Sequence, residues 1–285
     1  MCRLCAGIFL VTLILLLSAP RPVQAAESYD NCTGFITSIP TTISTQGTWC
    51  LKSDLATAIT SGSAISINTN NVTIDCNNFK LGGLAGGLSS SAYGIHAMAR
   101  FNATVRHCNI RGFWYGIFLQ DSSGGGHAIE DNRFDGNTYI AILVTGDGSV
   151  VRGNRIFDTG GSTLLGDAFG IFVGDSTDVL DNTIASVVAT AGSNGSAYGI
   201  YTTGDTDGTI SGNRIRGIVQ AGSGLASGIQ LVGDVRVILR DNDLLGSGNF
   251  GLHCGATASN AMGNVVSGFT TGISTCYDGG NLVRP

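Results

Sequence analysis

The sequence has little of what long helices and strongly charged surfaces require. Only 4 of its 285 residues are Pro, 12% are charged, and lysine occurs only at Lys52 and Lys80. In their place are 43 Gly and many Ser, Thr, Asn and Asp residues, which favour turns and strands over helix interiors. The composition therefore argues against a helical protein and indicates a chain of short strands and turns.

The apolar run at the start of the chain is too short to span a membrane. It extends from Ala6 to Leu17, after a short basic start and before Pro20, with Val23 and Ala25 placed for cleavage. A spanning helix needs roughly 20 apolar residues. Residues 1–26 therefore predict a secretory signal that is removed. We expect a secreted or periplasmic protein that has no membrane span after this cleavage.

The net charge argues against one class of partner, and the cysteine count indicates disulfides. Without residues 1–26 the chain has 13 basic and 20 acidic residues, a net charge near −7, so nucleic acid is not an expected partner. Six cysteines remain, an even number that in an oxidising compartment favours disulfides over metal thiolates. The expected pairs are Cys32–Cys50 at the start, Cys254–Cys276 at the end and, on weaker grounds, Cys76–Cys108.

One unit recurs along nearly the whole chain. It consists of Gly-Ile, a short strand, a Gly-Asp-like turn, a second short strand and a closing Asn turn. The first apolar position reads Ile65, Ile95, Ile117, Ile142, Ile171, Ile200, Ile229, Leu252 and Ile273. The closing turn reads Asn77, Cys108, Asn132, Asn154, Asn182, Asn213, Asn242 and Asn264. Such self-similarity predicts a solenoid.

The spacing of the units distinguishes between repeat folds. Successive closing turns lie 31, 24, 22, 28, 31, 29 and 22 residues apart. A propeller has a period of roughly 40 to 50 residues, and a leucine-rich repeat would show a Leu-x-x-Leu-x-Leu consensus that this chain lacks. The alternation within each unit is typical of strands.

Residues 60–282 resemble the right-handed parallel β-helix proteins of the pectin-lyase-like superfamily. The resemblance implies an all-β, single-stranded parallel β-helix of about eight to nine coils over residues 60–285. Residues 27–59, which contain Cys32 and Cys50, resemble the cysteine-bounded N-terminal cap of bacterial members. In such a solenoid equivalent residues stack about 4.8 Å apart.

Stacking assigns a structural role to most of the repeated polar residues. Asn tolerates the left-handed conformation and can both donate to and accept from the Asn one coil away. Asp147, Asp175, Asp205 and Asp234 of the Gly-Asp turns could instead bind calcium. The Gly-Gly-x-Gly-x-Asp calcium repeat is absent from the sequence, so we expect no cofactor and no metal site.

The residue after each inward apolar position should point outward, because side chains alternate along a strand. That column reads His96, Phe118, Leu143, Phe172, Tyr201, Gln230 and His253. Long insertions at residues 80–93, 157–169, 185–198 and 216–227 should form a wall beside it. Aromatic rings on a floor with loops at one edge suit the apolar faces of a linear sugar polymer. The open alternative is that the loops only cover the rings.

Signals for catalysis are weak. The Asn-Thr-Asp, Asp-Asp and Gly-His-Gly motifs of polygalacturonase-like members are absent. Asp158 and Asp167, on either side of one insertion, are the carboxylates that could serve a polysaccharide lyase or a glycoside hydrolase. Arg106, Glu130 and Arg152 share an outward column, which we interpret as cross-strand ion pairing.

The sequence thus predicts a monomeric protein that binds an extracellular polysaccharide or cell-surface glycan, with processing of the polymer left open. The aromatic and polar column, His96 to His253, is the expected carbohydrate-binding site. The alternative is a non-catalytic surface, adhesion or structural β-helix protein, because the fold itself does not fix the function.

Overall fold

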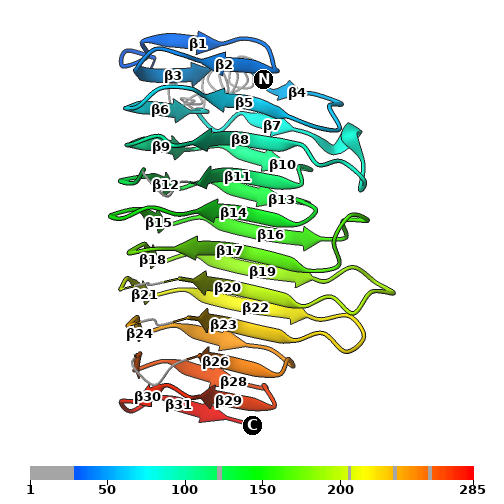
Figure 1. Ribbon diagram of the computed structural model, residues 1–285, viewed down its shortest axis with the longest axis vertical. Helices are drawn as coiled ribbons and strands as arrows, with labels where there is room; N and C mark the ends of the chain where they lie inside the picture. Colours follow the sequence, from blue (N-terminus) through cyan, green and yellow to red (C-terminus); the bar gives the residue numbers. More distant parts are fainter. Residues whose placement is uncertain (1–28, 121–123, 205–206, 234–235, 256–258) are drawn as a thin grey trace, which may run out of the picture. The chain divides into compact units, whose positions relative to one another are not determined.

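The chain winds into three parallel β-sheets, with one strand of each sheet in a complete coil. The computed structural model describes residues 29–285 except 121–123, 205–206, 234–235 and 256–258. Residues 32–285 form one compact unit. Figure 1 shows the coils following one another in sequence order, so that each strand pairs with its equivalents in the preceding and following coils.

The sheets contain 11, 10 and 10 strands and are named A, B and C here. Sheet A consists of β1 (Gly34–Ile36), β3 (Gly47–Leu51), β6 (Val72–Asp75), β9 (Ala103–Arg106), β12 (Ala128–Glu130), β15 (Val150–Arg152), β18 (Asp178–Leu180), β21 (Thr209–Ser211), β24 (Ile238–Arg240), β27 (Asn260–Met262) and β30 (Tyr277–Asp278). Sheet B consists of β2 (Thr41–Ile43), β5 (Ser63–Ile67), β8 (Tyr93–Met98), β11 (Tyr115–Gln120), β14 (Ile140–Val144), β17 (Ala168–Gly174), β20 (Ala197–Thr203), β23 (Ala226–Val232), β26 (Phe250–Cys254) and β29 (Thr271–Ser274). Sheet C consists of β4 (Leu55–Ala56), β7 (Lys80–Gly82), β10 (Asn109–Arg111), β13 (Arg133–Asp135), β16 (Arg155–Gly160), β19 (Thr183–Val188), β22 (Arg214–Val219), β25 (Asp243–Leu245), β28 (Val265–Ser267) and β31 (Leu282–Arg284).

These strands confirm the expected all-β parallel solenoid. The described residues contain one short helix, η1 (Leu84–Gly86), and no helix among them is long and apolar enough to cross a membrane. Strands β1–β4, within the predicted cap, already pair with the three sheets. The predicted signal, residues 1–26, lies outside the described residues.

The repeat pattern indicates two strands per unit, and the structure has a third. Strands β7, β16, β19 and β22 of sheet C occupy the first residues of the segments 80–93, 157–169, 185–198 and 216–227 that we expected to be insertions. The true loops are therefore shorter than predicted. They lie at the corner where the chain passes from sheet C to sheet B.

The interior is built from stacked aliphatic side chains. Ile95, Ile117, Ile142, Ile171, Ile200 and Ile229 are paired in register along sheet B, and each is 0% exposed. Sheet C supplies a matching inward column that includes Ile156, Ile184 and Ile215. Each fully buried side chain of this kind stabilises the fold by about 1.5 to 3 kcal/mol.

A ladder of buried asparagines closes the corner between sheets A and C. The Nδ2 of Asn182 donates to Oδ1 of Asn213 at 3.0 Å and to the carbonyl of Val151 at 2.9 Å. Equivalent amide bonds link Asn132, Asn154, Asn182, Asn213, Asn242, Asn264 and Asn281 in order.

The prediction was wrong at the first rung of this ladder. Asn77 lies outside it, and its amide donates to the carbonyl of Leu51. The turn between β6 and β7 has two more residues than the turn between β9 and β10, which moves Phe79 into the equivalent place beside Cys108. Asn281, which the sequence analysis did not include, continues the ladder at the other end.

All three expected cysteine pairs are bonded. They are Cys32–Cys50, Cys76–Cys108 and Cys254–Cys276. The first joins the start of the unit to β3, the second joins two successive corners between sheets A and C, and the third joins β26 to the residue before β30. One disulfide thus cross-links residues at each end of the solenoid, and the third cross-links two neighbouring coils at the corner between sheets A and C.

Candidate functional site

The predicted outward column exists and lies on sheet B. Register pairs place His96 beside Phe118, Phe172 beside Tyr201 and Gln230 beside His253, with Leu143 between Phe118 and Phe172. The aromatic members belong to a cluster separate from the interior core. The column is therefore on the outer face of the sheet, as the alternation predicted; its role in binding stays a prediction.

A second aromatic column runs parallel to the first, and the sequence analysis missed it. Register pairs align Tyr93, Tyr115, Ile140, Phe169, Tyr198, Ser227 and Phe250. Each lies three residues before its partner in the first column, so strict alternation would have pointed it inward. Together the two columns form what we call the aromatic face.

Glycine explains why both columns point outward. Gly199 lies between Tyr198 and the inward Ile200, and a Cβ on Gly199 would lie 2.6 Å from the interior Cγ2 of Ile215 and 2.5 Å from the carbonyl oxygen of Gly228. Two successive positions therefore face the interior, and Tyr198 and Tyr201 are both left outside. The sequence signal was the recurring aromatic-Gly-Ile-aromatic pattern, as in Tyr198 to Tyr201 and Phe169 to Phe172.

The rings pack against one another from coil to coil. Tyr93 and Tyr115 stack with centroids 5.2 Å apart, and Phe169 and Tyr198 also stack at 5.2 Å. Within one strand, Tyr198 and Tyr201 lie 4.9 Å apart. These distances fall in the favourable range for aromatic pairs. The rings hold one another in place, so the face is arranged before any ligand binds.

The aromatic face is partly covered and partly open. Phe118 is 8% exposed and Phe169 is 6% exposed, whereas Phe172, Tyr198 and Tyr201 are of intermediate exposure. Burial raises the pKa of the Tyr139 and Tyr201 hydroxyls, and the nearby charge of Asp167 adds to the effect on both. These hydroxyls are therefore neutral hydrogen-bonding groups at neutral pH.

The far end of the same face is more polar. Ser227 donates its hydroxyl to Oε1 of Gln230 at 3.0 Å, and the rings of Phe250 and His253 lie 4.5 Å apart. Burial lowers the pKa of both His96 and His253, so each imidazole is neutral near pH 7. Neither column contains Asp, Glu, Lys or Arg. The whole face is therefore uncharged at neutral pH.

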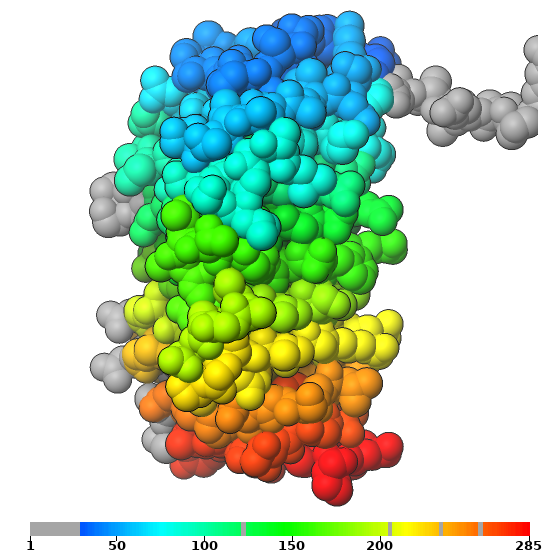
Figure 2. Space-filling view, turned by 90° about the vertical axis from the view of Figure 1, so that its right-hand side faces the viewer, coloured from blue at the N-terminus to red at the C-terminus, as the bar shows by residue number. Residues whose placement is uncertain are grey.

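Loops stand side by side along one edge of this face, as expected. The Thr190 hydroxyl donates to the carbonyl of Ser162 at 2.8 Å, and the Ala221 amide donates to the carbonyl of Gly195 at 2.9 Å. The loop after η1 reaches much further, because the Thr163 amide donates to the carbonyl of Leu88 at 3.1 Å. Figure 2 shows this side of the molecule, where the cyan segment reaches the green one.

The two candidate catalytic carboxylates lie on different elements. Asp167 directly precedes β17, and its Oδ1 accepts a hydrogen bond from the Ser196 amide at 2.6 Å. Its charge acts on Tyr139 and Tyr201, which places it beside the aromatic face. Asp158 instead lies within β16 of sheet C, exposed and with φ 55°, and not in a loop. Catalysis by either remains a prediction.

The turn aspartates that could have bound calcium are used by the backbone. Oδ2 of Asp175 accepts from the Gly146 amide at 2.8 Å, and Oδ1 of Asp147 accepts from the Ser176 amide at 3.4 Å. Asp205 and Asp234 lie outside the described residues. Within the described part of the chain, no three His, Cys, Asp or Glu side chains are grouped as metal ligands.

Charged residues on sheet A form cross-strand pairs: the pairing of Glu130 with Arg152 was expected, and Arg106 has a partner that was not predicted. Arg152 binds Glu130 at 2.9 Å, and Arg106 binds Asp75 at 2.8 Å. Burial opposes ionisation of Asp75, but hydrogen bonds from the Asn77 amide, His107 and Arg106 outweigh it and hold the pKa of this carboxyl below its usual value. This column therefore has a structural role.

Comparison with known proteins establishes a family. The family described as periplasmic copper-binding protein (NosD) matches residues 28–225. Because the match covers more than half of the chain, the chain belongs to this family. The periplasmic location of the family confirms the expected location outside the cytoplasm. No curated protein matches the chain.

One solved structure supports the fold, and a second is less similar. The Dettilon tailspike protein (gp208) is similar with a TM-score of 0.57 and 17% identity, over 87% of this chain and 53% of the tailspike. This chain thus spans about half the length of that protein. The A-module of the mannuronan C-5 epimerase AlgE6 from Azotobacter vinelandii has a TM-score of 0.39 and 13% identity, over 84% of this chain and 83% of the module.

Proposed function

We propose that this member of the NosD family binds an extracellular polysaccharide along the aromatic face of sheet B. The observation that supports the proposal most directly is the double column of rings on β8, β11, β17 and β20, aligned in register with Ile140 and Leu143 between them on β14. Sugar rings have apolar faces that pack on aromatic side chains, while their hydroxyls bond to polar groups at the edge.

The geometry favours a linear polymer over a small ligand. Strands of one sheet repeat at about 4.8 Å, so the rings of β8 and β11 and those of β17 and β20 present equivalent surfaces along the solenoid axis. The loop wall adds hydroxyl, amide and carbonyl groups beside them, such as those of Ser162 and Thr190. A chain of similar sugars can use each of these repeated surfaces in turn.

The family description names copper, but the described residues of this chain do not fit a copper centre. Copper is bound in proteins by imidazole, thiolate and thioether groups. All six cysteines beyond residue 26 are bonded in disulfides. Among the residues that the structure describes, no cluster of three His, Cys, Asp or Glu side chains occurs. The proposal therefore assigns no metal.

The decisive experiment is a binding assay of the secreted protein against an array of neutral and acidic polysaccharides. Tyr198→Ala and Tyr201→Ala should each weaken binding roughly three- to tenfold, because each removes a stacking surface. Tyr277→Ala is the matched control, since this residue is 68% exposed on sheet A, away from the aromatic face. Melting curves of all three variants separate lost binding from lost folding.

Two results would change the conclusion. A blank array, or equal loss of affinity in the Tyr277→Ala control, would favour the alternative of a passive surface or adhesion protein. Shortened or unsaturated products from a bound polymer would add catalysis, and Asp167→Asn would then test the carboxylate that lies beside the face.

A further inference from the structure

The outer face of sheet C concentrates positive charge on an otherwise acidic protein. Of the 13 basic residues beyond residue 26, seven lie outward in the two polar columns of this sheet. They are Lys80, Arg111, Arg133, Arg155, Arg214, Arg216 and Arg284. Four acidic residues, Asp54, Asp135, Asp158 and Asp243, accompany them. We call this surface the basic face.

Several of these charges neutralise one another. Lys80 binds Asp54 at 3.2 Å, and Arg111 binds Asp135 at 2.9 Å. Asp243 is shared by Arg214 at 3.5 Å and Arg216 at 3.3 Å. Such exposed pairs contribute little to stability, but they leave fewer positive charges uncompensated.

Two neighbouring arginines remain without an ion pair among the described residues. Arg133 and Arg155 are partners in the register of β13 and β16, so they lie on adjacent strands with both side chains exposed. Like charges directly opposite each other on a sheet are destabilising. The solenoid therefore carries a local excess of positive charge that an anion would relieve.

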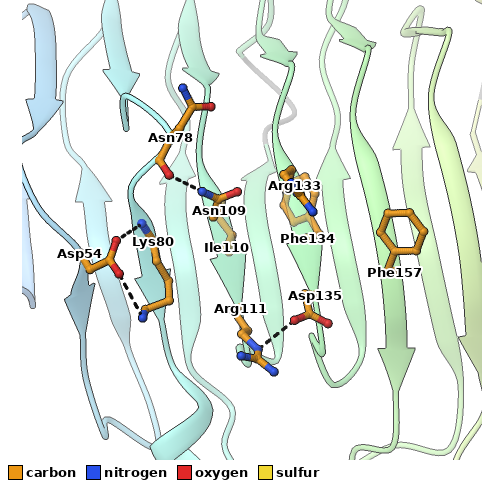
Figure 3. Close-up of a pocket in the computed structure, with 10 residues that line it drawn as sticks. All are labelled: Asp54, Asn78, Lys80, Asn109, Ile110, Arg111, Arg133, Phe134, Asp135 and Phe157. Atoms are coloured by element: carbon orange, nitrogen blue, oxygen red, sulfur yellow. Dashed lines mark hydrogen bonds and ion pairs between the residues drawn. The ribbon is translucent and has the colours of Figure 1, made fainter. Parts of the chain in front are cut away.

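An open hollow lies beside Arg133. It has a volume of about 560 Å³, and its lining crosses strands β7 to β16. Figure 3 shows Arg133 and Phe157 on neighbouring strands, with Arg111 turned toward Asp135. Phe157 is 39% exposed and lies two residues after Arg155 on the same face of β16. The hollow thus offers a ring surface and the unpaired guanidinium group of Arg133. Arg155 is not part of the lining, but it is the register partner of Arg133 and lies two residues before Phe157.

We infer that the basic face is a second binding site, which takes an acidic polysaccharide whose charged groups are carboxylates. Arg133 and Arg155 would hold carboxylates through charge-assisted, bidentate hydrogen bonds. Phe157 would pack against the apolar face of a sugar ring. The side-chain amides of Asn78 and Asn109, which also line the hollow, can bond to hydroxyls.

The acidic residues on this face argue against a more densely charged partner. Asp54 and Asp135 line the same hollow as Arg133. A nucleic acid brings one phosphate per nucleotide and depends on broadly positive surfaces. A sugar polymer with isolated carboxylates and apolar ring faces can place its charges on Arg133 and Arg155 while avoiding both aspartates.

The experiment uses the full secreted protein and fluorescent oligogalacturonate, with binding measured at low and high salt. The double variant Arg133→Gln/Arg155→Gln should lose roughly tenfold or more in affinity at low salt, because bonds to charged groups are lost. Binding of the unaltered protein should weaken as salt rises, and this dependence should be reduced in the double variant. Phe157→Ala should weaken binding but keep the salt dependence.

Arg240→Gln is the matched control, since it removes an exposed positive charge from sheet A. The inference is overturned if the double variant binds oligogalacturonate as tightly as the unaltered protein. It is also overturned if Arg240→Gln causes an equal loss, or if single-stranded DNA binds more tightly than the oligosaccharide. Tyr198→Ala/Tyr201→Ala should leave this binding unchanged, so failure here is distinguishable from failure at the aromatic face.

Discussion

The outer faces of sheets B and C differ although the same coils build both. Behind each face lies the same kind of inward column, Ile200 and Ile229 in sheet B and Ile184 and Ile215 in sheet C. The aromatic face has no charged residue in its two columns, whereas the basic face has seven cationic ones. The interior and the corners therefore specify the solenoid, and the outward positions are free to differ in chemistry from sheet to sheet.

The largest effect on stability is expected for a substitution in the interior, against which both sheets pack. Ile200→Ala removes a fully buried side chain from the common interior and should lower the free energy of unfolding by about 2 to 5 kcal/mol. Chemical denaturation measures this. Tyr201→Ala, the adjacent outward position, should cost clearly less. Equal losses at both positions would mean that the aromatic face is part of the core after all.

The second prediction compares the corners that lead into the two faces. Asn182→Ala leaves buried partners unpaired, including the Val151 carbonyl and the Asn154 amide, and should cost about 2 to 3 kcal/mol. Asn194→Ala in the loop corner before sheet B should cost less than about 1 kcal/mol, since its contact with Ser223 is exposed. Similar unfolding midpoints for the two variants would contradict the view that the corner between sheets A and C stabilises the fold more than the loop corner between sheets C and B.

The third prediction tests what makes sheet B different. Gly199→Ala places a Cβ against the Gly228 carbonyl and should destabilise the protein by about 1 to 3 kcal/mol. Ala141 occupies the equivalent place in β14, so Ala141→Gly is the reverse control and should change stability by about 1 kcal/mol or less. Thermal unfolding of both variants measures the two changes in stability. A harmless Gly199→Ala would show that the second column does not depend on glycine.

The smallest effect on stability should come from protonation of the two histidines of the aromatic face, which is uncharged at neutral pH. His96 and His253 have pKa values that burial holds below the usual value. Their neutral forms stabilise the fold fully above about pH 6.5, and this contribution is lost as the pH falls from there through the lowered pKa. The melting temperature should therefore decrease slightly between pH 7 and pH 5.

The variant His96→Gln/His253→Gln should remove part of that decrease, measured over the same pH range. Asp158→Asn on sheet C is the comparison variant; it keeps both histidines, so the slope between pH 7 and pH 5 should be unchanged. An identical slope in the histidine variant would show that these imidazoles do not differ in protonation between the folded and unfolded states.

The inward columns could be predicted from the sequence because identical environments repeat every coil. Ile95 to Ile229 and Asn132 to Asn264 occupy equivalent positions, so periodicity alone identified them. The first outward column followed by alternation. These predictions required only that each coil repeat the geometry of the previous one.

The features that were missed are local departures from that regularity. The second aromatic column depends on glycine positions at which two successive residues face inward, as at Gly199 and Ile200. Asn77 left the ladder because its corner is two residues longer than the next. The basic face was missed because residues such as Phe157 were assigned to loops, where no alternation is expected. The two proposed binding sites rest on these irregular and outward positions, which a repeat pattern does not constrain.

The long reach of the loop after η1 affects how the solenoid comes apart. In a stacked repeat each coil ordinarily touches only its immediate neighbours, so unfolding can spread coil by coil from either end. The bond between Leu88 and Thr163 joins segments 75 residues apart in sequence, past the short corners before β11 and β14. This contact adds one link beyond nearest neighbours to the coils from β8 to β17, so these coils should separate slightly less readily than the coils at either end.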